Sequence, residues 1–217
     1  VSAAPFHMWT PDVYQGAPSS VTAFFAIVPK LAAMAILMRL LFGPFSLMVD
    51  QWQQILVLMS VLSMLIGSFG GIAQTNLKRL LAYSSIGNMG YALIGLVVYT
   101  PEGASATLLY MLTLGGVFAI LLAMRRDDIH HDNISDFSGL SKTNPGLAYA
   151  MAALMFSMAG IPPLAGFFGK FFIFKAAMAA GYETLAVIGV LTSVVSAYYY
   201  LKVIKVMFFE EGDEEPL

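Results

Sequence analysis

Long apolar stretches alternate with short polar connections from one end of the chain to the other. A bilayer hydrocarbon core is about 30 Å thick, and a helix needs roughly 20 residues to cross it. The apolar stretches reach that length, so the pattern predicts an all-α polytopic membrane protein with about six transmembrane spans. The expected spans are residues 18–42, 52–71, 80–99, 104–124, 146–180 and 182–209.

The fifth apolar stretch, residues 146–180, is too long for one straight crossing of the bilayer. Its middle contains Pro162 and Pro163, which lack backbone N–H donors and clash with the preceding helical turn. Gly166 follows within one turn. We therefore predict a discontinuous helix that breaks at these three residues and places Lys170 just beyond the break, at membrane depth.

The two ends of the chain differ in character from its apolar middle. Residues 1–17 are punctuated by prolines and predict a cytoplasmic connection, and residues 210–217 form an acidic cytoplasmic tail. Residues 18–209 carry the expected spans, so residues 1–217 make up one transmembrane domain. The chain starts without a methionine, and we expect it to be a fragment of a longer protein.

Composition strengthens the membrane assignment and narrows the chemistry. Of the 217 residues, 59% are hydrophobic and 11% are charged, whereas soluble domains carry roughly 25% charged residues. The lack of cysteine excludes disulfides, thiolate metal sites and cysteine-ligated iron–sulfur clusters. No basic run interleaved with aromatics indicates nucleic acid, and His130 and His131 lack the spacing of a zinc motif. The expected environment is a lipid bilayer, with no metal and no nucleic acid.

Cations gather on one side of the expected membrane topology. With six alternating spans, seven cations of the connections and span ends fall on one side of the membrane, and Arg39 alone falls on the other. The positive-inside rule therefore predicts that the crowded side is cytoplasmic. The cations on that side are Lys78, Arg79, Arg125, Arg126, Lys142, Lys202 and Lys205.

The remaining three lysines lie inside the spans, whereas all 13 acidic residues lie in loops, the tail or span ends. Lys30 and Lys170 lie near the bilayer midplane, where a charge costs a few kcal/mol. Burial disfavours the charged form of an amine, so we predict that these two lysines relay protons. A silent structural role is the alternative. Lys175 lies close enough to the span end for its ammonium to reach the membrane surface. It is therefore either a snorkelling cation or a supporting group of the relay.

The third span carries polar side chains between these lysines. Asn88 and Ser85 lie in its middle, together with Ser84. These groups can hold water between the two lysines, or they can hydrogen-bond a neighbouring helix. Asn88 and Ser85 are therefore candidate supporting groups of the relay.

Four motifs together resemble the antiporter-like membrane subunits of bacterial respiratory complex I, and among them the subunit N family. They are residues 5–18, PFHMWTPDVYQGAP; 74–85, QTNLKRLLAYSS; 139–145, GLSKTNP; and 160–170, GIPPLAGFFGK. The resemblance covers essentially the whole chain. The last motif is also similar to multisubunit sodium/proton antiporters, whereas the first favours subunit N.

This resemblance implies a fold with two inverted repeats, each containing a discontinuous helix. The chain resembles the second part of such a subunit, from helix eight to helix thirteen. Lys30 then matches the central lysine of helix eight, and Lys170 matches the lysine of the broken helix twelve. Asn88 stands where many relatives carry a histidine, so a relay there would use the amide with water.

The function that the resemblance implies is proton translocation within NADH:quinone oxidoreductase, as a translocase subunit without a redox centre. NAD, FMN, iron–sulfur clusters and quinone would belong to partner subunits. The implied partners are the other membrane subunits of complex I, including the sister antiporter-like subunits, in a bacterial inner membrane rather than a mitochondrial one. Rival hypotheses are a sodium/proton antiporter subunit, a transporter for an anionic solute that uses the helix break, and a scaffold with silent lysines.

Overall fold

The computed structural model describes residues 2–123 and 133–211. These residues form nine α-helices and two short 3₁₀-helices. In chain order they are α1 (Thr10–Gly16), α2 (Ser19–Phe42), η1 (Ser46–Met48), α3 (Val49–Ile72), α4 (Leu77–Val97), α5 (Pro101–Ala123), η2 (Ile134–Phe137), α6 (Leu140–Thr143), α7 (Pro145–Ala159), α8 (Ala165–Ala179) and α9 (Glu183–Phe209).

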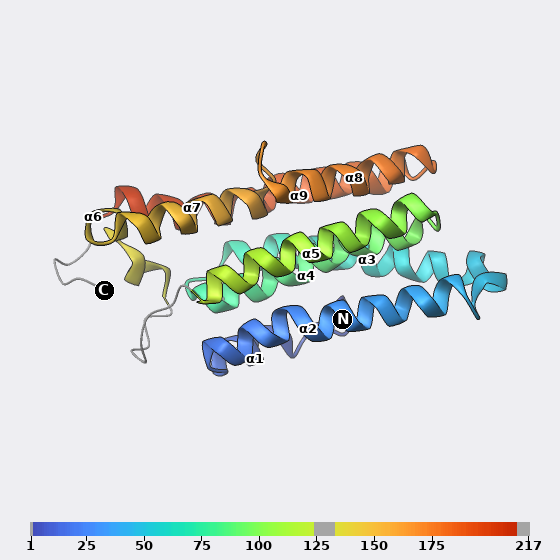
Figure 1. The fold of residues 1–217 in the computed structure, drawn as a ribbon, viewed down its shortest axis with the longest axis horizontal. Coiled ribbons are helices and arrows are strands. Elements are labelled where there is room, and N and C mark those ends of the chain that lie inside the picture. The colour runs from blue at the N-terminus through green and yellow to red at the C-terminus, as the bar shows by residue number, and fades with distance from the viewer. Residues whose placement is uncertain (1, 124–132, 212–217) are drawn as a thin grey trace.

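The long helices run along one common axis and form an elongated bundle (Figure 1). Helix α4 lies at its centre and packs against α1, α3, α5, α8 and α9. It is buried along almost its whole length, whereas α2, α3 and α9 each leave many side chains exposed. The polar side chains of α4 therefore face other helices and not lipid.

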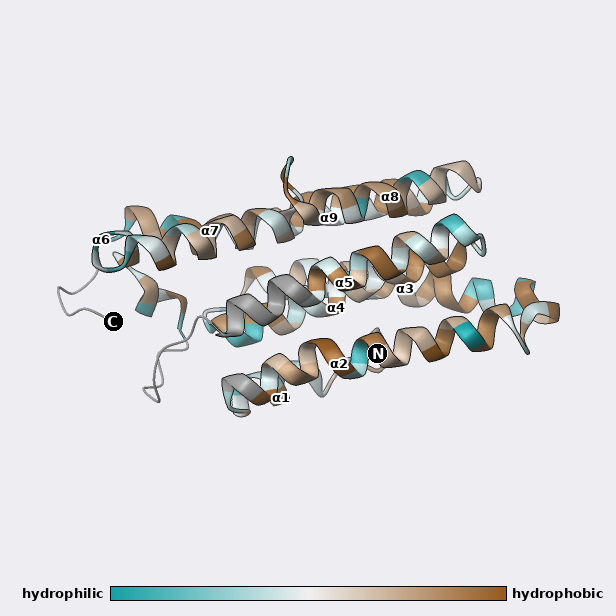
Figure 2. Cartoon of the chain, viewed as in Figure 1, coloured by the Kyte–Doolittle hydropathy of each residue, from teal (hydrophilic) through white to brown (hydrophobic). Residues whose placement is uncertain are grey.

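Four helical segments in the described residues are long and apolar enough to cross a membrane: 21–42, 46–72, 77–97 and 183–209. Figure 2 shows hydrophobic residues along the length of the long helices, with few hydrophilic interruptions. Helix α5 has 23 residues, and α7 and α8 have 15 each. At 1.5 Å per residue, α7 or α8 alone spans about 22 Å, too little for a 30 Å core. The two follow one another alongside α9 (Figure 1). The all-α fold and its discontinuous span are thus confirmed.

Asparagine side chains cap the N-termini of two helices, α4 and α7. The Asn76 side chain accepts a hydrogen bond from the Arg79 backbone N–H, 3.1 Å, at the start of α4. Asn144 accepts one from the Leu147 N–H, 3.3 Å, at the start of α7, where Pro145 occupies the first turn. Both side chains satisfy donors that have no partner inside the helix.

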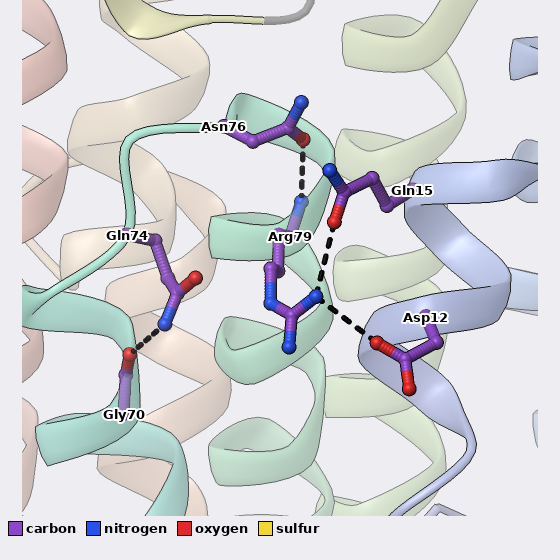
Figure 3. Close-up of polar contacts among 6 residues, drawn as sticks. All are labelled: Asp12, Gln15, Gly70, Gln74, Asn76 and Arg79. Atoms are coloured by element: carbon purple, nitrogen blue, oxygen red, sulfur yellow. Dashed lines mark hydrogen bonds and ion pairs between the residues drawn. The ribbon is translucent and has the colours of Figure 1, made fainter.

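Short helix α1 is attached to α4 by a polar cluster at one end of the bundle (Figure 3). Arg79 Nη1 donates to Asp12 Oδ1 and to Gln15 Oε1, both at 3.0 Å. The ion pair is largely exposed and contributes about 1 kcal/mol or less. Its main consequence is to orient α1, whose inner face carries the buried Tyr14.

The first residues of the connection at residues 1–17 lie between helices. Ala3 and Ala4 are buried, and the Ala4 N–H donates to Ser63 Oγ at 2.8 Å, near the middle of α3. Small side chains allow this backbone to enter between helices, which proline punctuation in the sequence does not reveal.

Lys78, Arg79, Lys142, Lys202 and Lys205 belong to elements that meet at one end of the bundle. The α3–α4 turn, η2, α6 and the end of α9 pack together there, and Asn76 pairs with Asn133 in an isolated β-bridge. Arg39 lies in the last turn of α2, at the other end. Arg125, Arg126, His130, His131 and residues 212–217 lie outside the described residues.

Candidate functional site

Lys30 projects from the middle of α2 into the bundle, where it is 4% exposed. Its ammonium donates to Tyr14 Oη at 2.8 Å and to Ser85 Oγ on α4. It also lies 5.1 Å from the centre of the Tyr14 ring, within the range of a cation–π contact. No carboxylate in the described part of the chain forms an ion pair with it. Among the described residues, the hydrogen-bond partners of Lys30 are therefore hydroxyl groups.

Lys170 is the equivalent buried cation of the discontinuous span, and it is 5% exposed. Its ammonium donates to the Met158 carbonyl at 3.0 Å and to Ser193 Oγ on α9 at 2.8 Å. The Tyr91 ring of α4 lies 5.1 Å away. Within residues 2–123 and 133–211, Lys170 has no acidic partner either.

The helix break explains why the Met158 carbonyl is free to bind Lys170. In an α-helix this oxygen would accept from the N–H four residues later, and that residue is Pro162, which has none. Gly160 ends α7 in the left-handed conformation, with φ of 86°. The carbonyl end of α7 carries partial negative charge, so an ammonium is stabilised there.

Gly166 brings the start of α8 against the end of α7. A Cβ at this position would lie 1.9 Å from the Ser157 carbonyl oxygen, so only glycine fits. The Gly166 N–H donates to Ser157 Oγ at 3.1 Å. Pro162, Pro163 and Gly166 all lie at or beside the break between Ala159 and Ala165.

Asn88 lies on α4 between the two lysine sites and is 2% exposed. Its amide donates to Ser84 Oγ at 3.2 Å and accepts from the Tyr110 hydroxyl of α5 at 2.7 Å. Ser84 Oγ in turn forms a hydrogen bond with the Tyr200 hydroxyl of α9. Because Ser84 is adjacent to the Lys30 partner Ser85, polar groups continue along α4 from one lysine site toward the other.

A small cavity separates Tyr110 from Lys170. Both residues line it, together with Thr113, Ser157 and Gly166, and its volume is about 10 Å³. That volume is about the minimum for one water molecule, which needs polar partners in such a place. The surface that faces the cavity is almost entirely apolar, so the side chains would have to turn toward a water to bind it.

A second group of hydroxyls continues from Tyr91 into the interface of α3 and α9. The Tyr91 hydroxyl donates to Thr192 Oγ1 at 3.3 Å, and Ser68 Oγ donates to the Thr192 carbonyl at 3.0 Å. Ser196 Oγ donates to Ser68 Oγ at 3.1 Å. All four are buried, so Lys170 borders a second polar path away from Asn88.

The structure places the remaining candidate, Lys175, apart from these sites. It is exposed on α8 and makes no polar contact with the described residues. No group of three or more His, Asp or Glu within the described ranges could hold a metal ion. Around the two lysines, the arrangement therefore offers hydroxyls, an amide and a backbone carbonyl as polar groups.

Sequence reasoning missed Tyr14, Tyr110, Tyr91 and Ser193 as partners of the two lysines and Asn88. Tyr110 and Tyr91 are mid-span aromatics that sequence alone cannot distinguish from packing residues. The sequence does contain one indication of the second group of hydroxyls. Thr192 and Ser196 are four residues apart in α9 and therefore lie on one helix face.

Comparisons with known proteins give a consistent family. The transmembrane family described as NADH:quinone oxidoreductase/Mrp antiporter matches residues 1–196. The NADH-quinone oxidoreductase subunit N of Rhodospirillum rubrum is 56% identical over 218 residues, which cover 99% of this chain and 45% of that protein. The chain thus spans about half the length of the curated relatives it matches.

Two solved structures are similar in fold over nearly the whole chain. Respiratory complex I from Thermus thermophilus, with bound aureothin, contains a chain that is 36% identical, with a TM-score of 0.85 and coverage of 98% of this chain and 47% of that one. The Mrp complex from Dietzia sp. DQ12-45-1b contains a chain that is 28% identical, with a TM-score of 0.85 and coverage of 100% and 40%.

Proposed function

We propose that this chain, which belongs to the NADH:quinone oxidoreductase/Mrp antiporter family, relays protons across the membrane as a subunit of respiratory complex I. One observation carries the proposal: two buried lysines lack any acidic partner in the described residues, and polar groups of α4 lie between them. Lys30 and Lys170 are the proton carriers, and Ser85 and Asn88 support them.

The hydroxyl partners suit a lysine that gains and loses a proton. A carboxylate only accepts, so it would hold the ammonium form, whereas Ser and Tyr hydroxyls both donate and accept. Ser85 and Tyr14 can therefore bond Lys30 in either state. The backbone carbonyl of Met158 accepts a hydrogen bond from Lys170 in either state, and the partial negative charge at the end of α7 favours the ammonium. A change in charge elsewhere in the complex would shift the proton between the two lysines.

Asn88 cannot titrate, so a proton passes it by way of hydroxyls and water. Its amide orients Ser84 on one side and Tyr110 on the other. The cavity beside Tyr110 has room for the one water that would connect this hydroxyl to Lys170. The amide thus fixes the direction of its neighbours' hydroxyls without carrying charge.

The electron-transfer chemistry belongs to partner subunits in this proposal. NAD, FMN, iron–sulfur clusters and quinone would bind there, and the lack of cysteine in this chain supports that division. The partners would be the other membrane subunits of complex I, including antiporter-like sisters. The bacterial origin of the similar subunits supports a place in the bacterial inner membrane.

Replacing Lys170 by alanine in the complete complex tests the proposal. NADH-driven proton pumping should fall severalfold, because the buried carrier is lost. Lys175→Ala is the matched control: it removes an exposed lysine from the same helix and should leave pumping unchanged. Unaltered coupled pumping in the Lys170 variant would refute the assignment.

A multisubunit sodium/proton antiporter is the second candidate, and the similarity to the Mrp complex favours it. A sodium site is expected to supply hard oxygen ligands such as carboxylates. Within the described helices, the acids Asp50, Glu102 and Glu183 lie in first turns, at span ends. Sodium-dependent proton exchange by the full assembly, without NADH, would decide for the antiporter.

A further inference from the structure

An open groove of about 640 Å³ lies at the cation-rich end of the bundle, away from the relay. Tyr198, Leu201, Lys202 and Lys205 of α9 form one wall. Thr75 of the α3–α4 turn and Ser135 of η2 contribute exposed hydroxyls from the other side. The β-bridge between Asn76 and Asn133 holds these two segments together.

The length of α9 places this groove at the membrane surface. Helix α9 begins at Glu183, an acid that marks the opposite boundary of the bilayer. At 1.5 Å per residue, Lys202 lies about 29 Å and Lys205 about 33 Å along the axis. The hydrocarbon core is about 30 Å thick, so both ammonium groups reach the headgroup layer. Tyr198, one turn earlier, lies at the depth typical of interfacial aromatics.

The charges in the groove suit a monovalent anion. Among the described residues, Lys202 donates only to the Gln74 carbonyl, at 3.4 Å, and Lys205 lies 3.7 Å from Glu210 in an exposed pair. Such exposed pairs are weak, at about 1 kcal/mol or less, so an anion can compete for Lys205. The described lining residues include two lysines and one glutamate, Glu210, so their net charge is positive by one.

An exposed apolar stripe leads from the groove down the outside of α9. Val187, Leu191, Val194, Tyr198 and Leu201 recur every three or four residues and therefore share one face. Val194 is 67% exposed, the largest fraction in the stripe. This surface has the length and character to pack against an acyl chain.

We propose that the groove binds one anionic phospholipid. Its phosphate lies between Lys202 and Lys205, the hydroxyls of Thr75 and Ser135 hydrogen-bond the headgroup, and an acyl chain lies along the α9 stripe. Basic pockets between helices at the cytoplasmic surface are suited to such headgroups. Phosphatidylglycerol fits better than phosphatidylcholine, because a choline headgroup would bring its own cation toward two lysines.

Photo-crosslinking in membranes tests this site in the complete protein. Membranes that contain the assembled complex receive a photoactivatable phosphatidylglycerol, and labelled peptides are mapped by mass spectrometry. The peptide that contains Tyr198–Val206 should be labelled, and severalfold less by the phosphatidylcholine analogue. The double variant Lys202→Gln/Lys205→Gln should lose most of the labelling. Lys142→Gln, an exposed lysine at the same end but outside the groove, should not.

Each contrary outcome identifies a different occupant. Equal labelling by both lipids would make this an ordinary lipid-facing surface, and no labelling would mean that protein covers it. Labelling that excess inorganic phosphate abolishes would assign the groove to a free anion. Any of these results would overturn the proposal, and none depends on whether the complex pumps protons.

Discussion

Neutral oxygens bind both buried lysines, and no carboxylate of residues 2–123 and 133–211 pairs with either of them. Tyr14 and Ser85 bind Lys30, and Ser193 binds Lys170 together with a backbone carbonyl. A buried ion pair would fix the lysine in its charged form, and breaking such a pair costs about 3–5 kcal/mol. Neutral partners avoid this penalty, so the proposed proton transfer would need a smaller change in free energy.

Tyr110→Phe isolates the contribution of one hydroxyl to the path. The change removes the 2.7 Å hydrogen bond to Asn88 and one polar group of the cavity beside Lys170. The net cost in folding free energy should be about 1 kcal/mol, and proton pumping by the complete complex should fall severalfold. Tyr149→Phe, at an exposed tyrosine of α7, is the control and should change neither. Equal pumping in the two variants would remove Tyr110 from the path.

Among the helices, the break in the discontinuous span has three local causes. Pro162 leaves the Met158 carbonyl without a helical partner, Gly160 supplies the left-handed turn, and Gly166 permits close contact with Ser157. Each of these causes acts within a few residues, so the local sequence determines the break.

Gly166→Ala should disrupt the junction between α7 and α8. The new Cβ would lie 1.9 Å from a backbone oxygen, which cannot move aside as a side chain could. We expect a loss of roughly 1–3 kcal/mol in the free energy of unfolding, measured by thermal unfolding of the full-length protein in detergent. Gly146→Ala is the matched control, because the nearest atom there is 3.9 Å away. It should be neutral or gain about 0.5–1 kcal/mol. A tolerated alanine at Gly166 would contradict the close packing.

Sequence was sufficient for the spans and the break, because apolar runs and prolines act locally. It could not find Tyr14, which is 16 residues from Lys30 and meets it only after α1 folds back onto α4. The same holds for Tyr110, whose hydroxyl reaches Asn88 across the α4–α5 interface. Partners of this kind depend on tertiary contacts, and a mid-span tyrosine carries no sequence signal that separates bonding from packing.

At the scale of the whole molecule, α4 joins the two lysine sites. It is the most buried span, and it contributes Ser85 to Lys30, Tyr91 to Lys170 and Asn88 between them. The surrounding helices supply one lysine from each side. In the proposed relay, a central polar helix enclosed by apolar ones would let protons move inside the bundle while its outer surface stays compatible with lipid.

The sharpest test of this connection is an Asn88→Leu variant. The number of protons pumped per NADH oxidised is measured in vesicles that contain the complete complex. Leucine is close in size to asparagine but can neither donate to Ser84 nor accept from Tyr110, while both lysines remain. Asn88→His, which restores polar groups, is the control for folding and assembly. The ratio should fall severalfold with leucine and be largely retained with histidine. An unchanged ratio in the assembled leucine variant would contradict it.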